Sequence, residues 1–338
     1  MVKNKVVKYD VLLLTESTLD IILEIEGSFP ILGGCTRRVK NTFLEPGGEG
    51  NILIMFSRMG GKILPVGPLG DDYYGTYLRN AYKKQGIDTS CLKTVKGFDT
   101  PVANCIIDEQ GEHSFVSYLK GCEFAEEEEV AKLLEECGGL FVSGYHIVDA
   151  DSAFFRLTLR LIDAAKKQGI PIFFDPGPLA GQMEQRALQK VLANSTVISL
   201  NNEEACSLTK CVDEETAAEK LAEQTNGVIV VKAGGQGCYV WFEGKGKWYP
   251  GFQVKVVDTM GAGDSFLGAL MYAWVKGFDM DTCFILANAA GAVKTAKFGT
   301  GTKVPTFDEM VAILERNGYN IPEVCKNVKK FVELKLEQ

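Results

Sequence analysis

Short apolar runs, rich in β-branched residues, alternate along this chain with longer segments whose apolar positions recur at helical spacing. The runs are candidate strands, at residues 11–14, 62–66, 139–142, 171–175, 196–200 and 228–232. The segments between them are candidate helices, at residues 52–59, 73–85, 152–167, 183–193, 202–209 and 214–224. Alternation of this kind predicts a mostly parallel sheet with helices on both faces. Near-continuous apolar strands fit that arrangement, because both faces of such a sheet are buried.

Two regions break the alternation and predict a small antiparallel flap beside the main sheet. Residues 19–26 pair with residues 38–44 in the first region, and residues 102–108 pair with residues 112–118 in the second. The intervening residues 109–111, Glu-Gln-Gly, supply a turn for the second pair.

Composition and charge narrow the classes of protein. The chain has 338 residues, enough for one large α/β domain or two, and its net charge is −8. Proteins that bind nucleic acid usually carry a surface dense in lysine and arginine. The sequence shows no such Lys/Arg-dense stretch, so nucleic acid is not an expected partner. No apolar run approaches the roughly 18 residues that span a bilayer. The N-terminal residues lack the apolar core of a signal peptide, and the ten cysteines stand singly. We expect a cytoplasmic protein with reduced thiols and no membrane partner.

Several common catalytic motifs are missing from the sequence. There is no GxxxxGK(S/T) phosphate loop, and no GxGxxG follows the first strand. The chain has only two histidines, His113 and His146. Metal clusters of histidine and carboxylate, and nucleophile triads built on histidine, are therefore hard to assemble.

The most informative stretch is residues 256–270, VVDTMGAGDSFLGAL. An apolar strand is expected to end at Asp258, and a helix is expected to begin near Asp264 after three small residues. Glycines at a helix N-terminus leave amide N–H groups open to a ligand, and the helix dipole favours an anion there. A carboxylate in that first turn can accept a proton while the amides stabilise a phosphoryl group in transfer. The simpler alternative is a glycine-rich helix start with an aspartate cap.

This stretch resembles the C-terminal signature of the ribokinase/PfkB family of carbohydrate and nucleoside kinases. Further segments resemble other landmarks of that family, in family order from about residue 10 to residue 305: residues 47–51 (GGEGN) with 56–60, residues 66–72 (VGPLGDD), residues 201–204 (NNEE) and residues 232–237 (KAGGQG). The resemblance implies a ribokinase-like three-layer α/β/α sandwich with a central, mostly parallel sheet and a small β-sheet lid. We expect one kinase domain over residues 1–320, a lid formed by about 17–45 and 98–120, and a surface helix or tail over 321–338.

The resemblance also implies roles for residues at matching positions. Asp264 would be the general base, and the amides of Gly261, Ala262 and Gly263 would form the anion hole. The acceptor side would comprise Asp20, expected at the end of the first strand, with Gly47, Gly48 and Asn51.

The same transfer of roles covers the donor side. Asn201 and Glu204 would organise Mg²⁺, the latter through water, since Mg²⁺ dehydrates reluctantly. The residues along the nucleotide would be Lys232, Gly234 and Gly237, with Asn288 toward the adenine. Asp258 and the Gly299 loop match the region where some members bind a monovalent cation such as K⁺.

The sequence departs from the family pattern at several points. The glycine signature is GGxxN, one residue tighter than in many sugar kinases, so that Glu49 is a candidate for contact with the substrate or with a lid residue. Met260 and Lys232 stand where threonine is common. The basic residue near the end of the late helix is Lys294 or Lys297.

The preferred function is therefore an ATP-dependent, Mg²⁺-requiring kinase that phosphorylates a hydroxyl group of a small carbohydrate, either a sugar or a sugar acid. A nucleoside kinase is the alternative within the family, and Phe115, Tyr118, Phe124 and Tyr145 are the aromatic residues available for a base. A catalytically silent sugar or nucleotide sensor is the alternative from another class. The expected partners are ATP and the small acceptor. A homodimer through the lid would use its apolar residues, Ile21, Leu23 and Ile25.

Overall fold

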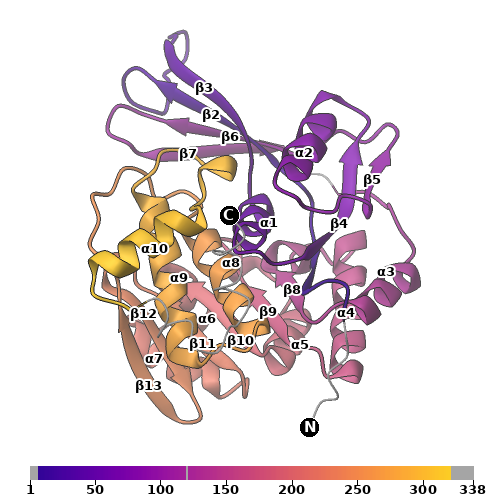
Figure 1. Ribbon diagram of the computed structural model, residues 1–338. Coiled ribbons are helices and arrows are strands. Elements are labelled where there is room, and N and C mark those ends of the chain that lie inside the picture. The colour runs from indigo at the N-terminus through magenta and orange to yellow at the C-terminus, as the bar shows by residue number, and fades with distance from the viewer. Residues whose placement is uncertain (1–6, 119–120, 321–338) are drawn as a thin grey trace.

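The computed structural model describes residues 7–118 and 121–320, and the tail expected over residues 321–338 lies outside them. Within the described residues, nine strands form one sheet in the order β13-β12-β11-β10-β9-β8-β1-β4-β5 (Figure 1). Neighbours from β11 to β5 are parallel, and β12 and β13 add an antiparallel edge. The strands are β1 (Val11–Leu14), β4 (Ile63–Gly70), β5 (Leu92–Val95), β8 (Leu140–Ser143), β9 (Ile172–Asp175), β10 (Val197–Asn201), β11 (Val228–Lys232), β12 (Gly237–Phe242) and β13 (Lys245–Pro250).

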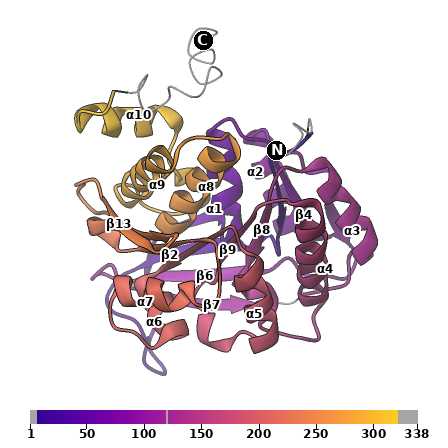
Figure 2. The same ribbon diagram turned by 90° about the horizontal axis from the view of Figure 1, so that it is seen from below.

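Helices cover both faces of this sheet, which confirms the expected three-layer sandwich (Figures 1 and 2). One layer contains α1 (Glu49–Arg58), α2 (Tyr73–Lys84), α8 (Ala262–Val275), α9 (Met280–Thr295) and α10 (Phe307–Arg316). The other contains α3 (Glu127–Leu133), α4 (Ala153–Gln168), α5 (Gln185–Asn194), α6 (Asn202–Thr209) and α7 (Glu214–Ala222). None of the helices in the described part of the chain combines the length and apolarity needed to cross a bilayer.

Local sequence explains most of these elements. All four residues of β1 and of β8 are buried, as two-sided burial in a parallel sheet requires. Helix α4 begins where the Ser152 side chain accepts a hydrogen bond from the Phe155 N–H, and it ends at Gly169 with φ +66°. The expected strands and helices therefore lie within a few residues of the observed bounds.

A second sheet of four strands forms the smaller layer at one end of the molecule (Figure 1). Its order is β3-β2-β6-β7, from β3 (Val39–Pro46), β2 (Leu19–Ile25), β6 (Val102–Ile107) and β7 (His113–Tyr118). Both expected hairpin pairings are antiparallel, and β2 joins β6 in parallel. The predicted smaller sheet is confirmed.

Three expectations about the elements were wrong or incomplete. Asp20 lies inside β2 of the small sheet, because β1 ends at Leu14 and a crossing segment follows. Residues 251–257, directly before Asp258, are not a strand: the N–H groups of Val257 and Asp258 donate to the Thr295 carbonyl at the end of α9, and Val256 and Val257 are 61% and 53% exposed. The β12–β13 hairpin was missed because its turn places a glutamate, Glu243, at φ +51° instead of the usual asparagine or glycine.

The order of the strands positions the site. From β1 the chain builds outward through β4 and β5 on one side, and later through β8 to β11 on the other. In open parallel sheets, ligands bind beyond the carboxyl ends of the strands where the order reverses. The residues that follow β1, β8, β9, β10 and β11 are therefore placed to form a ligand site.

Candidate active site

A row of polar residues follows the carboxyl ends of five adjacent strands. In sheet order they are Lys232 at the end of β11, Asn201 at the end of β10, Asp175 at the end of β9, Tyr145 after β8 and Glu16 after β1. Because neighbouring parallel strands end at the same edge, side chains distant in sequence share one cleft.

Three adjoining cavities occupy this cleft. The Gly-turn cavity, of about 260 Å³, lies between the 232–237 turn and helices α8 and α9. The central cavity, of about 410 Å³, is lined by Asp175, Glu204 and Asp264, among others. The small-sheet cavity, of about 480 Å³, lies under β6 and β7 and also reaches Asp264. Asp264 therefore stands at the wall shared by the second and third cavities.

Helix α8 presents Asp264 and its neighbouring amides to these cavities. Gly261 is the N-cap residue with φ +69°, a left-handed conformation that suits glycine. The Ala262 N–H donates a 3.2 Å bond to the Thr259 carbonyl. Within the described residues, no acceptor is found for the N–H of Gly261 or Gly263. These two amides and the helix dipole suit an anion at this point.

The Asp264 carboxylate is held by Asn51 from helix α1. Asn51 Nδ2 donates to Asp264 Oδ2 at 2.9 Å, and Asn51 Oδ1 accepts from the Gly301 N–H at 2.6 Å. Burial raises the pKa of Asp264 to about 6, and the nearby Asp175 carboxylate adds to the increase. The Asn51 bond and Lys232 oppose this shift by favouring the ionised form. A fixed carboxylate with a pKa near neutrality is suited to general-base chemistry.

Asp20 reaches the small-sheet cavity from strand β2. Its carboxylate is 6% exposed and accepts a 2.8 Å bond from the Thr300 hydroxyl. Burial raises the pKa of Asp20 to about 7. Gly47 packs directly behind it: a Cβ built on Gly47 would lie 1.9 Å from Asp20 Oδ1. Glycine is therefore required there for the close approach of the backbone to the carboxylate.

If Asp20 binds the acceptor, as the family resemblance implies, the substitution Gly47→Ala should displace Asp20 and raise the acceptor KM by about 10- to 100-fold, the loss of a hydrogen bond to a charged group. The KM for ATP should change little, because Asp20 does not line the Gly-turn cavity. Steady-state kinetics with each substrate varied in turn would measure both values. Gly33→Ala is the matched control, since a Cβ there meets no atom within 4 Å. An unchanged acceptor KM in Gly47→Ala would remove Asp20 from acceptor binding.

Asn201 and Glu204 form a capping box at the start of helix α6. The Glu204 N–H donates to Asn201 Oδ1 at 2.8 Å, and Glu204 Oε2 accepts from the Asn201 N–H at 2.7 Å. In the described part of the chain no hydrogen bond is found to Glu204 Oε1, and Glu204 lines the central cavity. Burial, followed by the nearby Asp175 carboxylate, raises the pKa of Glu204 to about 7.

Lys232 is the cation of the central cavity. Its Nζ lies 3.0 Å from Asp175 Oδ2, and the two side chains are 13% and 17% exposed. Burial opposes the charge of Lys232, yet the carboxylates of Asp175 and Glu204 outweigh it and raise the pKa of the lysine. An ammonium in this position can meet a phosphate that enters from the Gly-turn cavity.

Oxygen donors in the central cavity fit Mg²⁺. Carboxylate and amide oxygens are the ligands that this hard cation takes in proteins. Among the described residues, no three His, Cys, Asp or Glu side chains converge closely enough to hold a metal by themselves. Asn201 and Glu204 would therefore hold Mg²⁺ together with water and substrate phosphate.

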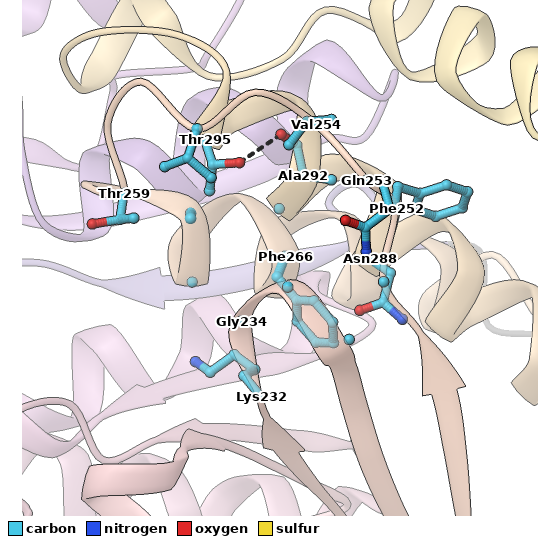
Figure 3. Close-up of a pocket in the computed structure, with 17 residues that line it drawn as sticks. Lys232, Gly234, Phe252, Gln253, Val254, Thr259, Phe266, Asn288, Ala292 and Thr295 are labelled. Atoms are coloured by element: carbon cyan, nitrogen blue, oxygen red, sulfur yellow. Dashed lines mark hydrogen bonds between the residues drawn. The ribbon is translucent and has the colours of Figure 1, made fainter.

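The Gly-turn cavity has an apolar interior (Figure 3). Asn288 donates to the carbonyls of Tyr249 and Pro250, at 3.1 and 3.3 Å, and so fixes the end of β13 against helix α9. Gly237 adopts φ +103° in close contact with Tyr249. The apolar side chains that line the cavity are Phe252, Val254, Val256, Phe266 and Ala292. An apolar slot beside a glycine turn can take a flat heteroaromatic base.

Asp258 stabilises the loop that leads into α8, residues 259–263, which we call the anion loop. Its carboxylate accepts from the N–H groups of Met260 and Gly299, at 2.9 and 2.7 Å, and lies 3.5 Å from His113 Nε2 of the small sheet. Lys294 is fully buried nearby and donates to the Lys297 carbonyl. Burial lowers the pKa of Lys294, and the Asp258 carboxylate counteracts that effect.

The structure brings most of the expected residues together. Those that line the three cavities are Asp20, Gly48, Asn51, Asn201, Glu204, Lys232, Gly234, Gly237, Gly261, Ala262, Gly263, Asp264 and Asn288. Gly47 and Asp258 act through their contacts with Asp20 and the anion loop. Sequence reasoning missed Asp175, Glu16 and Thr300. Asp175 ends a predicted strand and Glu16 follows one, and ligands bind at that end of parallel strands, so the positions of these two residues could have identified them. No local feature of the sequence marks Thr300.

Comparisons with known proteins show which family this chain resembles. A family model described as pfkB family carbohydrate kinase matches residues 9–307. Ribokinase of Haemophilus influenzae is 26% identical over 294 residues, which cover 83% of this chain and 91% of the relative. Probable fructokinase-4 of Arabidopsis thaliana is 30% identical over 289 residues, which cover 80% of this chain and 88% of the relative.

Solved structures share the fold. Arabidopsis thaliana ribokinase, complexed with ribose and ATP, superposes with a TM-score of 0.76 at 20% identity over 91% of this chain and 99% of its own. A Burkholderia thailandensis nucleoside kinase in complex with inosine superposes with a TM-score of 0.74 at 22% identity, over 92% of this chain and 98% of its own. An Escherichia coli protein solved with ATP and Mg²⁺ superposes with a TM-score of 0.74 at 21% identity, over 91% of this chain and 99% of its own. These likenesses show a ribokinase-like fold.

Proposed function

This chain belongs to the pfkB family of carbohydrate kinases, phosphotransferases that act on an alcohol group of a sugar or nucleoside, and we propose that it transfers the γ-phosphoryl group of ATP to a hydroxyl group of a small carbohydrate. One observation carries the proposal. The Asp264 carboxylate, held by Asn51 at 2.9 Å, stands at the N-terminus of α8 between two cavities of suitable size for donor and acceptor.

The residues divide the reaction between them. Asp20 and Asn51 orient the acceptor in the small-sheet cavity, and Asp264 takes the proton of the attacking hydroxyl. The amides of Gly261, Ala262 and Gly263 stabilise the charge on the transferring group, and those of Gly261 and Gly263 are preorganised for it because they have no acceptor among the described residues. Ala262 would exchange its long bond to Thr259 for this contact. The new O–P bond forms on the acceptor as the bond to the ADP oxygen breaks.

Lys232, Gly234 and Gly237 would lie along the nucleotide, whose base would enter the apolar slot beside Asn288. Asn201 and Glu204 would hold Mg²⁺, which when bound would neutralise charge on the phosphates. The structural neighbour from Escherichia coli was solved with ATP and Mg²⁺, which supports ATP as the donor and Mg²⁺ as the metal.

The small sheet would serve as the lid of the acceptor cavity. Ala103 of β6 and both Phe115 and Ser117 of β7 line its roof. Exclusion of water by such a roof would limit ATP hydrolysis and strengthen the electrostatic interactions inside.

A nucleoside acceptor is the second candidate. Phe115 and Tyr145 both line the small-sheet cavity, and the structural neighbour from Burkholderia thailandensis binds inosine. The other two aromatic residues considered for a base do not favour it, because Phe124 packs on Phe154 in the core and Tyr118 is not among the lining residues. A silent sensor would have no use for a base beside an anion hole.

An ATP-consumption screen over free hexoses, pentoses, sugar acids, sugar phosphates and nucleosides tests the proposed function. We expect turnover with at least one free carbohydrate. Turnover restricted to nucleosides would select the second candidate. No turnover with any acceptor, from a folded protein that binds ATP, would support the sensor instead.

Removal of the metal is expected to abolish turnover in this assay, because Asn201 and Glu204 would lose the ion that screens the phosphates. Activity should return on addition of Mg²⁺ in excess over EDTA. Undiminished turnover in EDTA would contradict the metal assignment.

Replacement of K⁺ by a tetraalkylammonium salt tests whether a monovalent cation is needed near Asp258. We expect turnover to change little, since the buried Lys294 already supplies positive charge there.

The homodimer through the small sheet stays a prediction. Ile25 is buried within the protomer, whereas Ile21 and Leu23 remain half-buried. The mass in solution, measured by light scattering, would test it.

A further inference from the structure

The small-sheet cavity has an unusual balance of charge. Four carboxyl groups line it, from Glu16, Asp20, Glu49 and Asp264, and none of the lining residues within 7–118 and 121–320 is a lysine, arginine or histidine. The proposed function uses only Asp20 and Asp264. Glu16 and Glu49 therefore need a separate explanation.

Glu49 lies at the first turn of α1 and has no cationic partner among the described residues. It is 8% exposed, and its carboxylate accepts a long, 3.5 Å bond from the Thr15 hydroxyl. Its nearest basic group is His146, whose Nε2 lies 3.6 Å from Glu49 Oε1, beyond hydrogen-bond range. His146 is 1% exposed, stacks on Phe154, and has no hydrogen-bond partner for either ring nitrogen. Burial lowers the pKa of His146 to about 3, so the imidazole is neutral and provides no counter-charge.

Glu16 lies in the segment that connects β1 to β2. Within the described residues, its carboxylate has no hydrogen bond and no ion pair. Burial raises the pKa of Glu16 to about 7 and that of Glu49 to about 8, and the Glu16 carboxylate adds to the increase at Glu49. Carboxyl groups withdrawn from water without a cationic partner destabilise a fold, and such groups gather at ligand sites.

The only cation that lines any of the three cavities, within the described part of the chain, is Lys232. It lines the Gly-turn and central cavities but not the small-sheet cavity, and it is already paired with Asp175 at 3.0 Å. An anionic group on the acceptor would therefore lose its hydration beside four carboxyl groups, and no cation of the described lining would replace that hydration.

We propose that Glu16 and Glu49 select an acceptor that is uncharged or positively charged and that presents hydroxyl or amino donors to them, and that they exclude acceptors bearing a carboxylate or phosphate. This inference rests on the proposed function and narrows it to neutral and amine-bearing molecules. Carboxyl groups accept hydrogen bonds from such donors, and rejection of the anionic analogue needs only the unpaired like charges.

The test compares kcat/KM for matched acceptors: glucose, glucosamine and gluconate; fructose and fructose 6-phosphate; ribose and ribose 5-phosphate; inosine and inosine 5′-monophosphate. In each set that contains a substrate, we expect the anionic member to be at least about 100-fold poorer, given one unscreened like-charge contact at protein dielectric. An anionic member that equals or exceeds its neutral partner would overturn the inference and leave the kinase assignment standing. Absence of turnover with every acceptor would instead count against the proposed function.

The double variant Glu16→Gln/Glu49→Gln assigns the selection to these two residues. Glutamine preserves size and removes charge, so the neutral-to-anionic ratio of kcat/KM should fall at least about 10-fold. The melting temperature should stay the same or rise, because neutral amides replace two carboxyl groups whose ionisation the fold opposes, and this shows that the variant is folded. Glu315→Gln, on the exposed face of α10, is the control of equal charge change. An unchanged ratio in the folded double variant would overturn the inference.

Discussion

The substitution Asp264→Asn is expected to lower kcat by ~10²–10⁴-fold, the contribution of a positioned general base. The asparagine keeps the size of the side chain but cannot take the proton of the attacking hydroxyl. Binding of ATP and of the acceptor should persist, because Asn51, Asp20 and Lys232 remain in place. Pre-steady-state phosphoryl transfer and calorimetric binding would separate the two effects.

The pH profile provides an independent check of this assignment. The pKa of Asp264 is raised to about 6, so the carboxylate keeps its proton to a higher pH than an ordinary aspartate. The base is active only when ionised, and wild-type kcat should therefore fall as the pH drops through about 6. Asp20 and Glu204, whose pKa values are raised to about 7, titrate beside it, so that the acid limb reports the coupled group.

The control for this prediction is Asp308→Asn on the exposed first turn of α10, which should retain full activity. The acid limb of the residual activity of Asp264→Asn should differ from that of the wild type, because only Asp20 and Glu204 of the coupled group still titrate. Full activity of Asp264→Asn, with the acid limb intact, would assign the base to another residue.

The substitution Lys232→Met is expected to reduce kcat/KM for ATP by ~10²–10³-fold, the cost of one electrostatic contact to the transferring group. Lys232 lines both the Gly-turn and the central cavities and supplies the only positive side chain of the described lining. Without it, Asp175, Glu204 and Asp264 would repel the incoming phosphates. Steady-state kinetics at saturating acceptor would measure the loss.

A double variant separates catalysis from folding at this position. Lys232→Met alone leaves a mostly buried Asp175 without its partner, and we expect the free energy of unfolding to fall by up to about 3 kcal/mol. Lys232→Met/Asp175→Asn removes both charges and should recover most of that stability but little activity. Lys84→Met, exposed at the end of α2, is the matched control. Recovery of full activity in the double variant would show that Lys232 only neutralises Asp175.

Local pattern determined much of the fold. Apolar runs at residues 11–14 and 228–232 were located as strands at their observed bounds, because two-sided burial leaves a continuous signature within the run itself. The helix at 202–209 and both hairpin pairings of the small sheet were likewise readable, since caps and turns act over three or four residues. The glycine-rich start of α8 identified an anion site next to a carboxylate for the same reason.

Only the tertiary structure decided which of these residues meet. Asn51 and Asp264 are 213 residues apart, and Asp20 and Thr300 are 280 apart, yet each pair is hydrogen-bonded. Asp20 was expected at the end of the first strand and lies in the small sheet instead, because the chain leaves β1 at Leu14 before it turns. The partnership of Asp175 with Lys232, and the unpaired Glu16 and Glu49, depend on strand order. That order is set by long-range packing of buried faces, and no short segment of the sequence carries it.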